Sequence, residues 1–167
     1  MSDASKNVNR DTGSLRAVSK LPYRPGDMIA EKYQLLSLIG KGGMGAIYVA
    51  RHKTIDQALA IKLHLSDRVD GTAWKRFERE GQLLARLNHP GIVKILEIGK
   101  NGDGNPYYVM ELLEGTTLAE RLNRNSILSQ EEIVHIFPLI LEALGFVHQN
   151  SVVHRDVKPT NIMLVRP

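Results

Sequence analysis

The residues best able to do chemistry lie near the end of the chain, in the stretch His154-Arg155-Asp156-Val157-Lys158-Pro159-Thr160-Asn161. This stretch combines a carboxylate that accepts protons, an ammonium group that stabilises negative charge and a carboxamide oxygen suited to a hard cation. A long helical pattern precedes it, and the apolar run at residues 162–165 predicts a short strand after it. Loops between rigid elements are where catalytic groups concentrate. We therefore interpret the stretch as a catalytic loop, although Asp156 alone would also suit an ordinary turn.

A second candidate is the glycine-rich segment Gly40-Lys41-Gly42-Gly43-Met44-Gly45. The alternating pattern at residues 33–39 and the apolar run at residues 47–50 predict a strand on each side of it. Glycine lets a hairpin tip approach a ligand closely. The same G-x-G-x-x-G spacing marks dinucleotide-binding turns, but those lead from a strand into a helix. A strand on both sides favours a cover over phosphates, and a plain glycine hairpin stays open from this segment alone.

A lysine and a glutamate are expected to form a pair in the same region. Lys62 interrupts the apolar strand predicted at residues 58–63. An unpaired buried ammonium group is costly, so Lys62 needs an anion unless it reaches solvent from an edge strand. A helix is predicted at residues 72–87, and Glu80 falls on its inward face. The apolar residues of that face are Phe77, Leu84 and Leu87. Glu80 is therefore the expected partner of Lys62.

Taken in chain order, these features resemble the bacterial branch of the Hanks-type serine/threonine protein kinases. The resemblance rests on G-K-G-G-M-G-A-I-Y, on the A-I-K that ends at Lys62, on R-F-x-R-E with Glu80, and on H-R-D-x-K-P-x-N at residues 154–161. It covers residues 33–167. It implies an α+β, protein-kinase-like fold: a five-stranded antiparallel N-lobe sheet with one helix, followed by the first part of a mainly helical C-lobe.

The resemblance divides the chain into three parts. Residues 1–32 are expected to form a flexible basic tail, because they are polar and lack apolar periodicity. Residues 33–113 would form the N-lobe and the hinge, with further strands at residues 92–98 and 107–110. Residues 114–167 would form a partial C-lobe that ends after the catalytic loop. Its helices are predicted at residues 117–124 and from the capping box Ser129-x-x-Glu132 to about residue 148.

The resemblance implies that ATP and Mg²⁺ bind between the lobes. Asp156 would accept or orient the proton of the substrate hydroxyl, Lys158 would stabilise the transferring phosphoryl group, and Asn161 would ligate magnesium. Lys62, paired with Glu80, would orient the phosphates. The residues of the phosphate cover would be Gly40, Lys41, Gly42, Gly43 and Gly45. His154 would have a structural role, and Arg155 would receive a phosphorylated activation loop.

The adenine is expected to meet the hinge, with Met110 as the gatekeeper. Glu111 and Leu113 would contribute main-chain atoms. The rest of the adenine slot would be Ile39, Ile47, Ala60 and Met163. Each of these apolar residues also suits the core of a strand, and both readings can hold in an apolar cleft.

Composition limits the other classes of function. Hydrophobic residues make up 43% of the chain and charged residues 24%, as in ordinary soluble domains. The net charge of +4 is scattered, which argues against nucleic-acid binding. The chain has no cysteine, no apolar N-terminal signal and no uninterrupted apolar segment long enough for a membrane span. We expect a cytoplasmic protein that acts on serine or threonine of a protein substrate, with autophosphorylation and a downstream membrane anchor left open.

The 167 residues contain no D-F-G, the motif that carries the family's main magnesium ligand. We therefore expect the chain to be a C-terminally truncated piece of a longer kinase, poorly stable and inactive on its own. Three members of the family's hydrophobic spine would have counterparts in Leu84, Ile95 and His154. Two alternatives stay open: a non-catalytic, pseudokinase-like module that binds nucleotide, and an interaction module whose exposed helix docks onto a partner.

Overall fold

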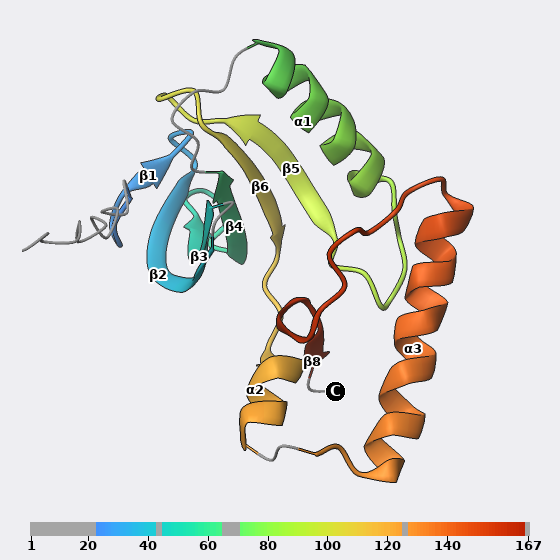
Figure 1. Ribbon diagram of the computed structural model, residues 1–167. Coiled ribbons are helices and arrows are strands. Elements are labelled where there is room, and N and C mark those ends of the chain that lie inside the picture. Colours follow the sequence, from blue (N-terminus) through green and yellow to red (C-terminus); the bar gives the residue numbers. More distant parts are fainter. Residues whose placement is uncertain (1–22, 43–44, 65–70, 125–126, 166–167) are drawn as a thin grey trace, which may run out of the picture.

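The main body of the protein is a six-stranded antiparallel sheet with a helix packed on one face (Figure 1). The computed structural model describes residues 23–42, 45–64, 71–124 and 127–165. The strands are β1 (Met28–Ile29), β2 (Tyr33–Gly42), β3 (Gly45–His52), β4 (Ala58–His64), β5 (Ile95–Lys100) and β6 (Pro106–Glu111), in the spatial order β1-β2-β3-β4-β6-β5. The kinase-like α+β fold is confirmed. The predicted number of five strands is wrong, because the short β1 pairs with the outer edge of β2.

Residues 23–32, assigned to the tail from the sequence, belong to the folded sheet. Tyr23 is 6% exposed and Ile29 is fully buried. The Tyr48 hydroxyl donates to the carbonyl oxygen of Tyr23 at 3.0 Å, and the Tyr23 hydroxyl donates to Asp103 Oδ2 at 3.1 Å. The Tyr23 hydroxyl also accepts from the side-chain amide of Asn101, which lies in the β5–β6 turn. The predicted end of the tail at residue 32 is therefore wrong, because residues 23–32 belong to the fold. Residues 1–22 lie outside the described part of the chain.

The hydrophobic core lies on one face of the sheet. Residues directly opposite one another on neighbouring strands project to the same side. Tyr48 pairs with Ile61, and Ile61 pairs with Val109, so these three side chains share a face. The largest fully buried side chains are Ile29, Leu35, Tyr48, Ile61, Leu63 and Val109. Because this face holds the core, the opposite face is available for a helix and for a ligand.

The helix α1 (Gly71–Ala85) covers part of that opposite face. Phe77 stacks on Tyr108 of β6 with ring centroids 4.3 Å apart, and the ring of His64 meets Phe77 edge-on at 4.8 Å. A Cβ atom at Gly81 would lie only 2.7 Å from both Ile98 Cδ1 and Tyr108 Cε1. Glycine at this position therefore lets α1 pack closely on β5 and β6.

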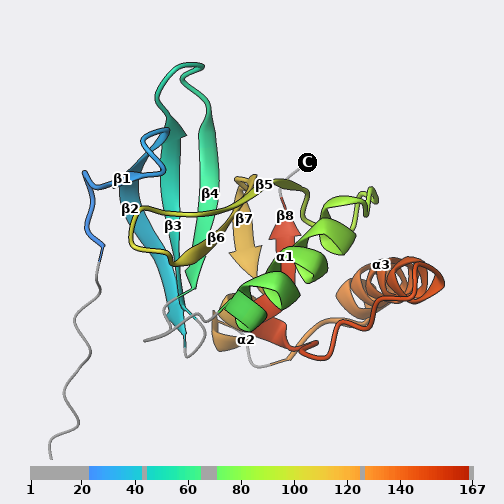
Figure 2. The same ribbon diagram turned by 90° about the horizontal axis from the view of Figure 1, so that it is seen from above.

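The C-terminal part consists of β7 (Gly115–Thr117), α2 (Leu118–Arg124), α3 (Gln130–Gln149), the 3₁₀ turn η1 (Pro159–Asn161) and β8 (Met163–Val165). The predicted capping box is confirmed: Ser129 Oγ accepts from the Glu132 N–H at 3.1 Å, and Glu132 Oε2 accepts from the Ser129 N–H at 2.8 Å. The helix α3 stands apart from the six-stranded sheet in both ribbon views (Figure 1, Figure 2). No helix in the described residues is both long enough and apolar enough to cross a membrane.

The strands β7 and β8 form a small sheet that the sequence indicated only in part. They pair antiparallel, with Thr117 opposite Met163. A Cβ atom at Gly115 would lie 2.2 Å from the carbonyl oxygen of Leu164, so only glycine permits this close approach. The Leu118 N–H also donates to the carbonyl oxygen of Ile162 at 2.8 Å. These contacts fix the end of the predicted catalytic loop beside the segment that follows the hinge.

Candidate active site

The three predicted catalytic residues come together on the loop between α3 and β8. Lys158 Nζ lies 2.9 Å from Asp156 Oδ2. Asn161 Nδ2 donates to the same Oδ2 at 2.9 Å and to the main-chain carbonyl oxygen of Asp156, also at 2.9 Å. All three side chains are exposed. The loop thus presents one carboxylate, held on two sides, to a ligand or substrate.

The conformation of the loop depends on local main-chain contacts. The Asp156 N–H donates to the carbonyl oxygen of His154 at 2.8 Å, and the intervening Arg155 has a positive φ of 61°. Such a conformation is unusual for a residue other than glycine, although Ala30, Glu31, Asp56 and Ser151 also adopt it in this protein. The Asn161 N–H closes η1 by donating to the Lys158 carbonyl oxygen at 2.9 Å. The turn therefore brings Asn161 back to Asp156.

The charge state of Asp156 follows from these neighbours. The Lys158 ammonium, and then the Asn161 amide, lower the pKa of the Asp156 carboxyl below its ordinary value. The carboxylate is thus ionised at neutral pH and can accept a hydrogen bond from a substrate hydroxyl. Because the amide nitrogen of Asn161 is directed at Asp156, its Oδ1 is the atom left to ligate a cation. An oxygen ligand of this kind suits magnesium.

The predicted adenine slot and Lys62 share the face of the sheet opposite the core. Ile47 pairs with Lys62, and Ala60 pairs with Met110, so these four side chains project to the same side. Ala60 is 6% exposed, whereas Ile47, Lys62 and Met110 are partly buried. Ile39 is 52% exposed, at a shift of register between β2 and β3.

Among the described residues of the glycine-rich hairpin, Gly45 is a position that requires glycine. Gly45 has φ +145°, and a Cβ atom there would lie 2.0 Å from the carbonyl oxygen of Leu63 on β4. Gly40 and Gly42 have open space around them, as a cover over a ligand requires. Lys41 is exposed on the same hairpin, and Gly43 lies outside the described residues. The strand-loop-strand prediction is confirmed by β2 and β3 on either side.

The hinge begins where β6 ends. Glu111 is the last residue of β6, and Leu113 lies beyond it, so the main chain of Leu113 takes no part in the ladders of the sheet. Both residues are partly buried. Met163 is partly buried on β8, which pairs with the segment directly after the hinge. The hinge and the catalytic loop are therefore joined through the small β7–β8 sheet (Figure 2).

The expected pair of Lys62 and Glu80 is not formed in this structure. Glu80 is exposed, and within the described residues no ion pair joins it to Lys62. Aromatic packing holds α1 instead, through the Phe77 stack on Tyr108. Burial, with a smaller effect of the Glu80 charge, raises the pKa of Tyr108 to about 12.

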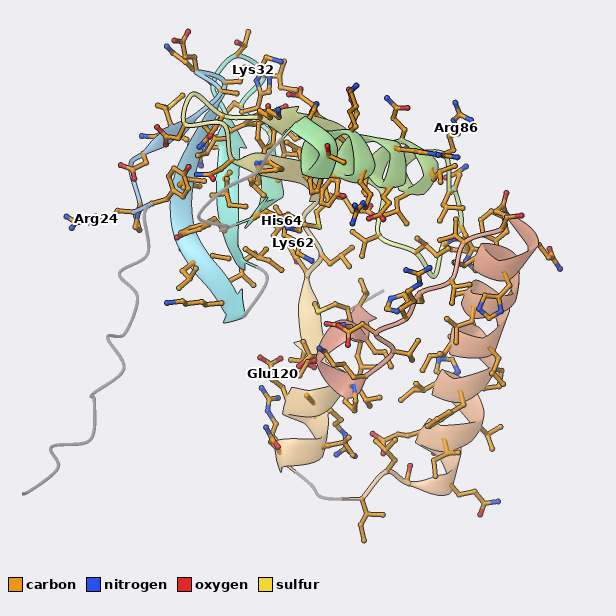
Figure 3. The ribbon with its side chains drawn as sticks, turned by 45° about the horizontal axis from the view of Figure 1, so that its top comes forward. Arg24, Lys32, Lys62, His64, Arg86 and Glu120 are labelled. Atoms are coloured by element: carbon orange, nitrogen blue, oxygen red, sulfur yellow. The ribbon has the colours of Figure 1, made fainter. Side chains whose placement is uncertain are left out.

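His64 is a site residue that the sequence reasoning missed. It lies two residues after Lys62 on β4, and the two side chains lie side by side beneath α1 (Figure 3). Burial, and then the charge of Lys62, lower the pKa of the His64 imidazole to about 4. Its Nε2 is buried and has no hydrogen-bond partner among the described residues. The period-two pattern of β4 was the available signal, because it places residues 60, 62 and 64 on one face.

Comparison with known proteins agrees with this geometry. Residues 33–167 match the family model for the protein kinase domain. The chain is 40% identical over 140 residues to the serine/threonine-protein kinase PrkC of Bacillus subtilis, covering 83% of this chain and 22% of that protein. It is 38% identical over 140 residues to the serine/threonine-protein kinase pkn3 of Myxococcus xanthus, covering 83% of this chain and 26% of that protein.

Solved kinase domains have a similar structure. The crystal structure of the Mycobacterium tuberculosis PknI kinase domain superposes with a TM-score of 0.73 at 27% identity. That alignment covers 86% of this chain and 58% of the PknI chain. The chain therefore spans about a fifth to a quarter of the length of the curated relatives it matches and somewhat more than half of a solved kinase domain.

Proposed function

The chain belongs to the protein kinase domain family, with bacterial serine/threonine kinases as its relatives, and on this premise we propose the following activity. The protein transfers the γ-phosphoryl group of ATP to a serine or threonine hydroxyl of a protein substrate. The observation that supports this most strongly is the ionised Asp156 carboxylate, held by Lys158 and Asn161 at 2.9 Å each. Phosphoryl transfer asks the protein mainly for positioning and charge stabilisation, which such a cluster supplies.

The residues present fit a magnesium nucleotide. The open side of the sheet offers an apolar floor at Ala60 with a cation, Lys62, next to it on the same face. The hairpin glycines Gly40 and Gly42 leave room above that face, and Asn161 offers a carboxamide oxygen. When bound, magnesium neutralises phosphate charge and helps to align the reacting groups. Lys62 would hold the phosphates, and Asn161 would hold the metal.

Each catalytic-loop residue would have a separate role in the transfer reaction. Asp156 would accept a hydrogen bond from the substrate hydroxyl and orient its oxygen for attack. Lys158 would stabilise the negative charge of the transferring group while also holding Asp156 in place. Glu80 would pair with Lys62 after a movement of α1, because the two are unpaired in the present arrangement. The aromatic contacts of Phe77 would have to change during that movement.

The substrate would be a protein with an accessible serine or threonine, and a second copy of the protein is one such substrate, through autophosphorylation. We propose a cytoplasmic location for the catalytic residues, where ATP and magnesium are available. The absence of cysteine from the 167 residues suits a reducing compartment.

A second function is favoured by one observation. The exposed position of Glu80 leaves Lys62 without the glutamate partner that phosphate orientation needs. A protein that kept this arrangement would bind nucleotide without transferring phosphate, as a pseudokinase-like module. This alternative shares the ATP site and differs only in turnover.

The test is transfer of radiolabelled γ-phosphate from Mg-ATP to a serine- and threonine-containing protein, using the protein that contains this chain. We expect label on serine or threonine, with loss of at least about 10²-fold in rate for Asp156→Asn. Glu120→Gln, on the exposed side of α2, is the matched control and should keep the wild-type rate. Nucleotide binding without transfer would favour the non-catalytic alternative, and the same rate in Asp156→Asn would refute the role of Asp156.

A further inference from the structure

The outward face of α1 carries basic side chains that the proposed transfer reaction does not use. Phe77 stacks on Tyr108, and Gly81 lies against the sheet, so these two positions define the inward face. Arg79 is two positions from both Phe77 and Gly81 and therefore projects about 200° away from each of them, toward solvent. The basic row of this outward face consists of four exposed residues: Lys75, Arg76, Arg79 and Arg86. Arg86 lies at the end of α1, clear of the sheet (Figure 3).

The charges of the basic row are not neutralised within the described part of the chain. Glu78 and Glu80 lie on the same helix, but no ion pair joins either of them to the row among the described residues. Like charges three or four positions apart repel one another, as Arg76 and Lys75 each do with Arg79. The first turn of α1 also has no acidic residue to offset the positive end of the helix dipole. The basic row therefore destabilises α1, and an anionic partner would relieve this repulsion.

The spacing of the basic row fits a phosphorylated peptide. Arg76 and Arg79 are one helical turn apart, with Cβ atoms separated by about 5–6 Å, so both guanidinium groups can reach one phosphate. Arg86 continues the last turn of the helix, because its N–H donates to the Leu83 carbonyl oxygen at 3.2 Å. It lies about 10 Å beyond Arg79 along the helix axis. An extended peptide covers this distance in about three residues, so a second negative charge at that spacing would meet Arg86.

A phosphopeptide suits the basic row better than other anionic partners do. A helix that binds a membrane buries its apolar face in the lipid, whereas the apolar face of α1 is packed on the sheet through Phe77. The row is only about 16 Å long and has fewer cations than the roughly six to ten phosphate contacts of a duplex-binding protein. The proposed reaction also supplies the required chemistry, since its product carries phosphoserine or phosphothreonine.

We propose that the basic row on α1 is a docking site for a phosphorylated segment of a protein substrate. Arg76 and Arg79 hold the phosphoserine or phosphothreonine, and Arg86 holds a carboxylate or a second phosphate three positions away. The inference rests on the proposed function for the source of the phosphate, and it names the phosphorylated product as the partner. Because the row and the catalytic loop lie on different elements, a product held by α1 leaves Asp156 free for the next hydroxyl of the same substrate.

The experiment measures the fluorescence anisotropy of three labelled synthetic peptides with the protein that contains this chain. The first peptide has a central phosphoserine with an aspartate three positions away on each side. The second has the same residues with each aspartate moved next to the phosphoserine, and the third is the first peptide without phosphate. The variants are Arg76→Ala, Arg79→Ala and Arg86→Ala. Arg24→Ala, at an exposed arginine outside the row, is the matched control (Figure 3). Far-ultraviolet circular dichroism checks that each variant is folded.

The wild-type protein should bind the first peptide about tenfold or more tightly than the unphosphorylated one, as expected for charge-assisted hydrogen bonds to phosphate. Arg76→Ala and Arg79→Ala should each lose about tenfold in affinity for the phosphopeptide, whereas Arg24→Ala should bind as wild type does. Arg86→Ala should keep the dependence on phosphate and lose the preference for the first peptide over the second.

Equal binding of the phosphorylated and unphosphorylated peptides would overturn the inference, as would wild-type affinity in Arg76→Ala and Arg79→Ala. Binding that is weakened by Lys158→Ala and not by Arg79→Ala would place the peptide at the catalytic loop and also overturn it. Tighter binding to vesicles of phosphatidylcholine and phosphatidylserine, lost in Arg79→Ala, would reassign the row to a membrane. Because the peptides are synthesised with the phosphate in place, their binding by a protein that transfers no phosphate would support the docking site and refute the proposed function.

Discussion

Acidification is predicted to destabilise the protein through His64, and replacement of this residue by phenylalanine is predicted to remove the effect. His64 is held in an aromatic cluster, with its ring centroid 4.8 Å from that of Phe77 and 5.7 Å from that of Tyr108. Its Nε2 is buried without a partner among the described residues, and Lys62 lies beside it on β4. A proton on the imidazole would therefore create a buried charge next to an ammonium group. The charge of Glu80 acts on the adjoining Tyr108, where it contributes to the raised pKa of that hydroxyl.

The size of the effect follows from the pKa of His64. Burial and Lys62 lower it from 6.5 to about 4, so the unfolded chain binds the proton more tightly than the folded one. The stability that His64 contributes is complete above pH 6.5 and is lost as the pH falls toward 4. Linkage gives a loss of about 2 kcal/mol between about pH 7.5 and pH 5, which solvent screening at this partly exposed site reduces to about 1 kcal/mol.

Urea unfolding at about pH 7.5 and pH 5 is the assay, because the difference between the two pH values cancels changes in intrinsic stability. The loss of unfolding free energy on acidification should be about 1 kcal/mol smaller in His64→Phe than in wild type. Phenylalanine keeps an aromatic ring in the cluster and cannot take up a proton. His135→Asn, on the exposed side of α3, should retain the wild-type loss. The same pH dependence of the unfolding free energy in wild type and His64→Phe would refute the assignment of the effect to His64.

Three substitutions test the packing that positions the site. Gly45→Ala should lower the unfolding free energy by about 3 kcal/mol, because its Cβ would meet the main chain of β4 in a backbone conformation that favours glycine. Tyr23→Phe should lower it by about 1–3 kcal/mol, because the buried Asn101 amide loses its partner hydroxyl. Gly81→Ala should lower it by about 1 kcal/mol, since crowding against Tyr108 outweighs the better helix propensity of alanine.

Denaturant titrations at neutral pH measure all three effects. Gly102→Ala is the control for the glycine variants, because a Cβ at that exposed turn meets nothing within 4 Å and should change stability little. Wild-type stability in Gly45→Ala would contradict the close approach to β4. A more stable Gly81→Ala would show that α1 does not pack on the sheet through this residue. An unfolding free energy of Tyr23→Phe equal to that of wild type would contradict the contribution of the Tyr23 hydroxyl contacts to the fold.

The division of the sheet into two faces explains how the site is built. One face is covered by the core, to which the N-terminal segment contributes Tyr23 and Ile29. The family match begins at residue 33, so both of these buried side chains lie ahead of it. The other face carries Ala60 and Lys62, with α1 covering only the part near β5 and β6. The core thus stabilises one face of the sheet and leaves the opposite face available for a ligand.

Local pattern and motif spacing predicted most of the elements and the grouping of the catalytic loop. The tight turn at η1 brings Asn161 to Asp156 over only five residues, so a contiguous motif was enough to predict their proximity. The capping box at Ser129 was likewise predictable, because both of its bonds are local. Signals of this kind act within a few residues and do not depend on tertiary packing.

The features that the sequence did not predict depend on contacts between distant segments. The two-residue β1 has too short a pattern to identify, and its place is fixed by pairing with β2. Tyr23 is held by Asp103, eighty residues away. The exposure of Glu80 follows from the way Gly81 sets α1 on the sheet, which helical spacing alone does not determine. The buried state of His64 depends on Phe77 of the same helix.

The most direct test is a calorimetric titration, with ATP, of the protein that contains this chain, with and without magnesium. We expect saturable binding that is strengthened by magnesium, is weakened about tenfold or more by Lys62→Ala, and loses its magnesium dependence in Asn161→Ala. Lys53→Ala, exposed on the β3–β4 turn, should bind as wild type does. No binding, or binding of equal strength in wild type, Lys62→Ala and Asn161→Ala with or without magnesium, would contradict the account.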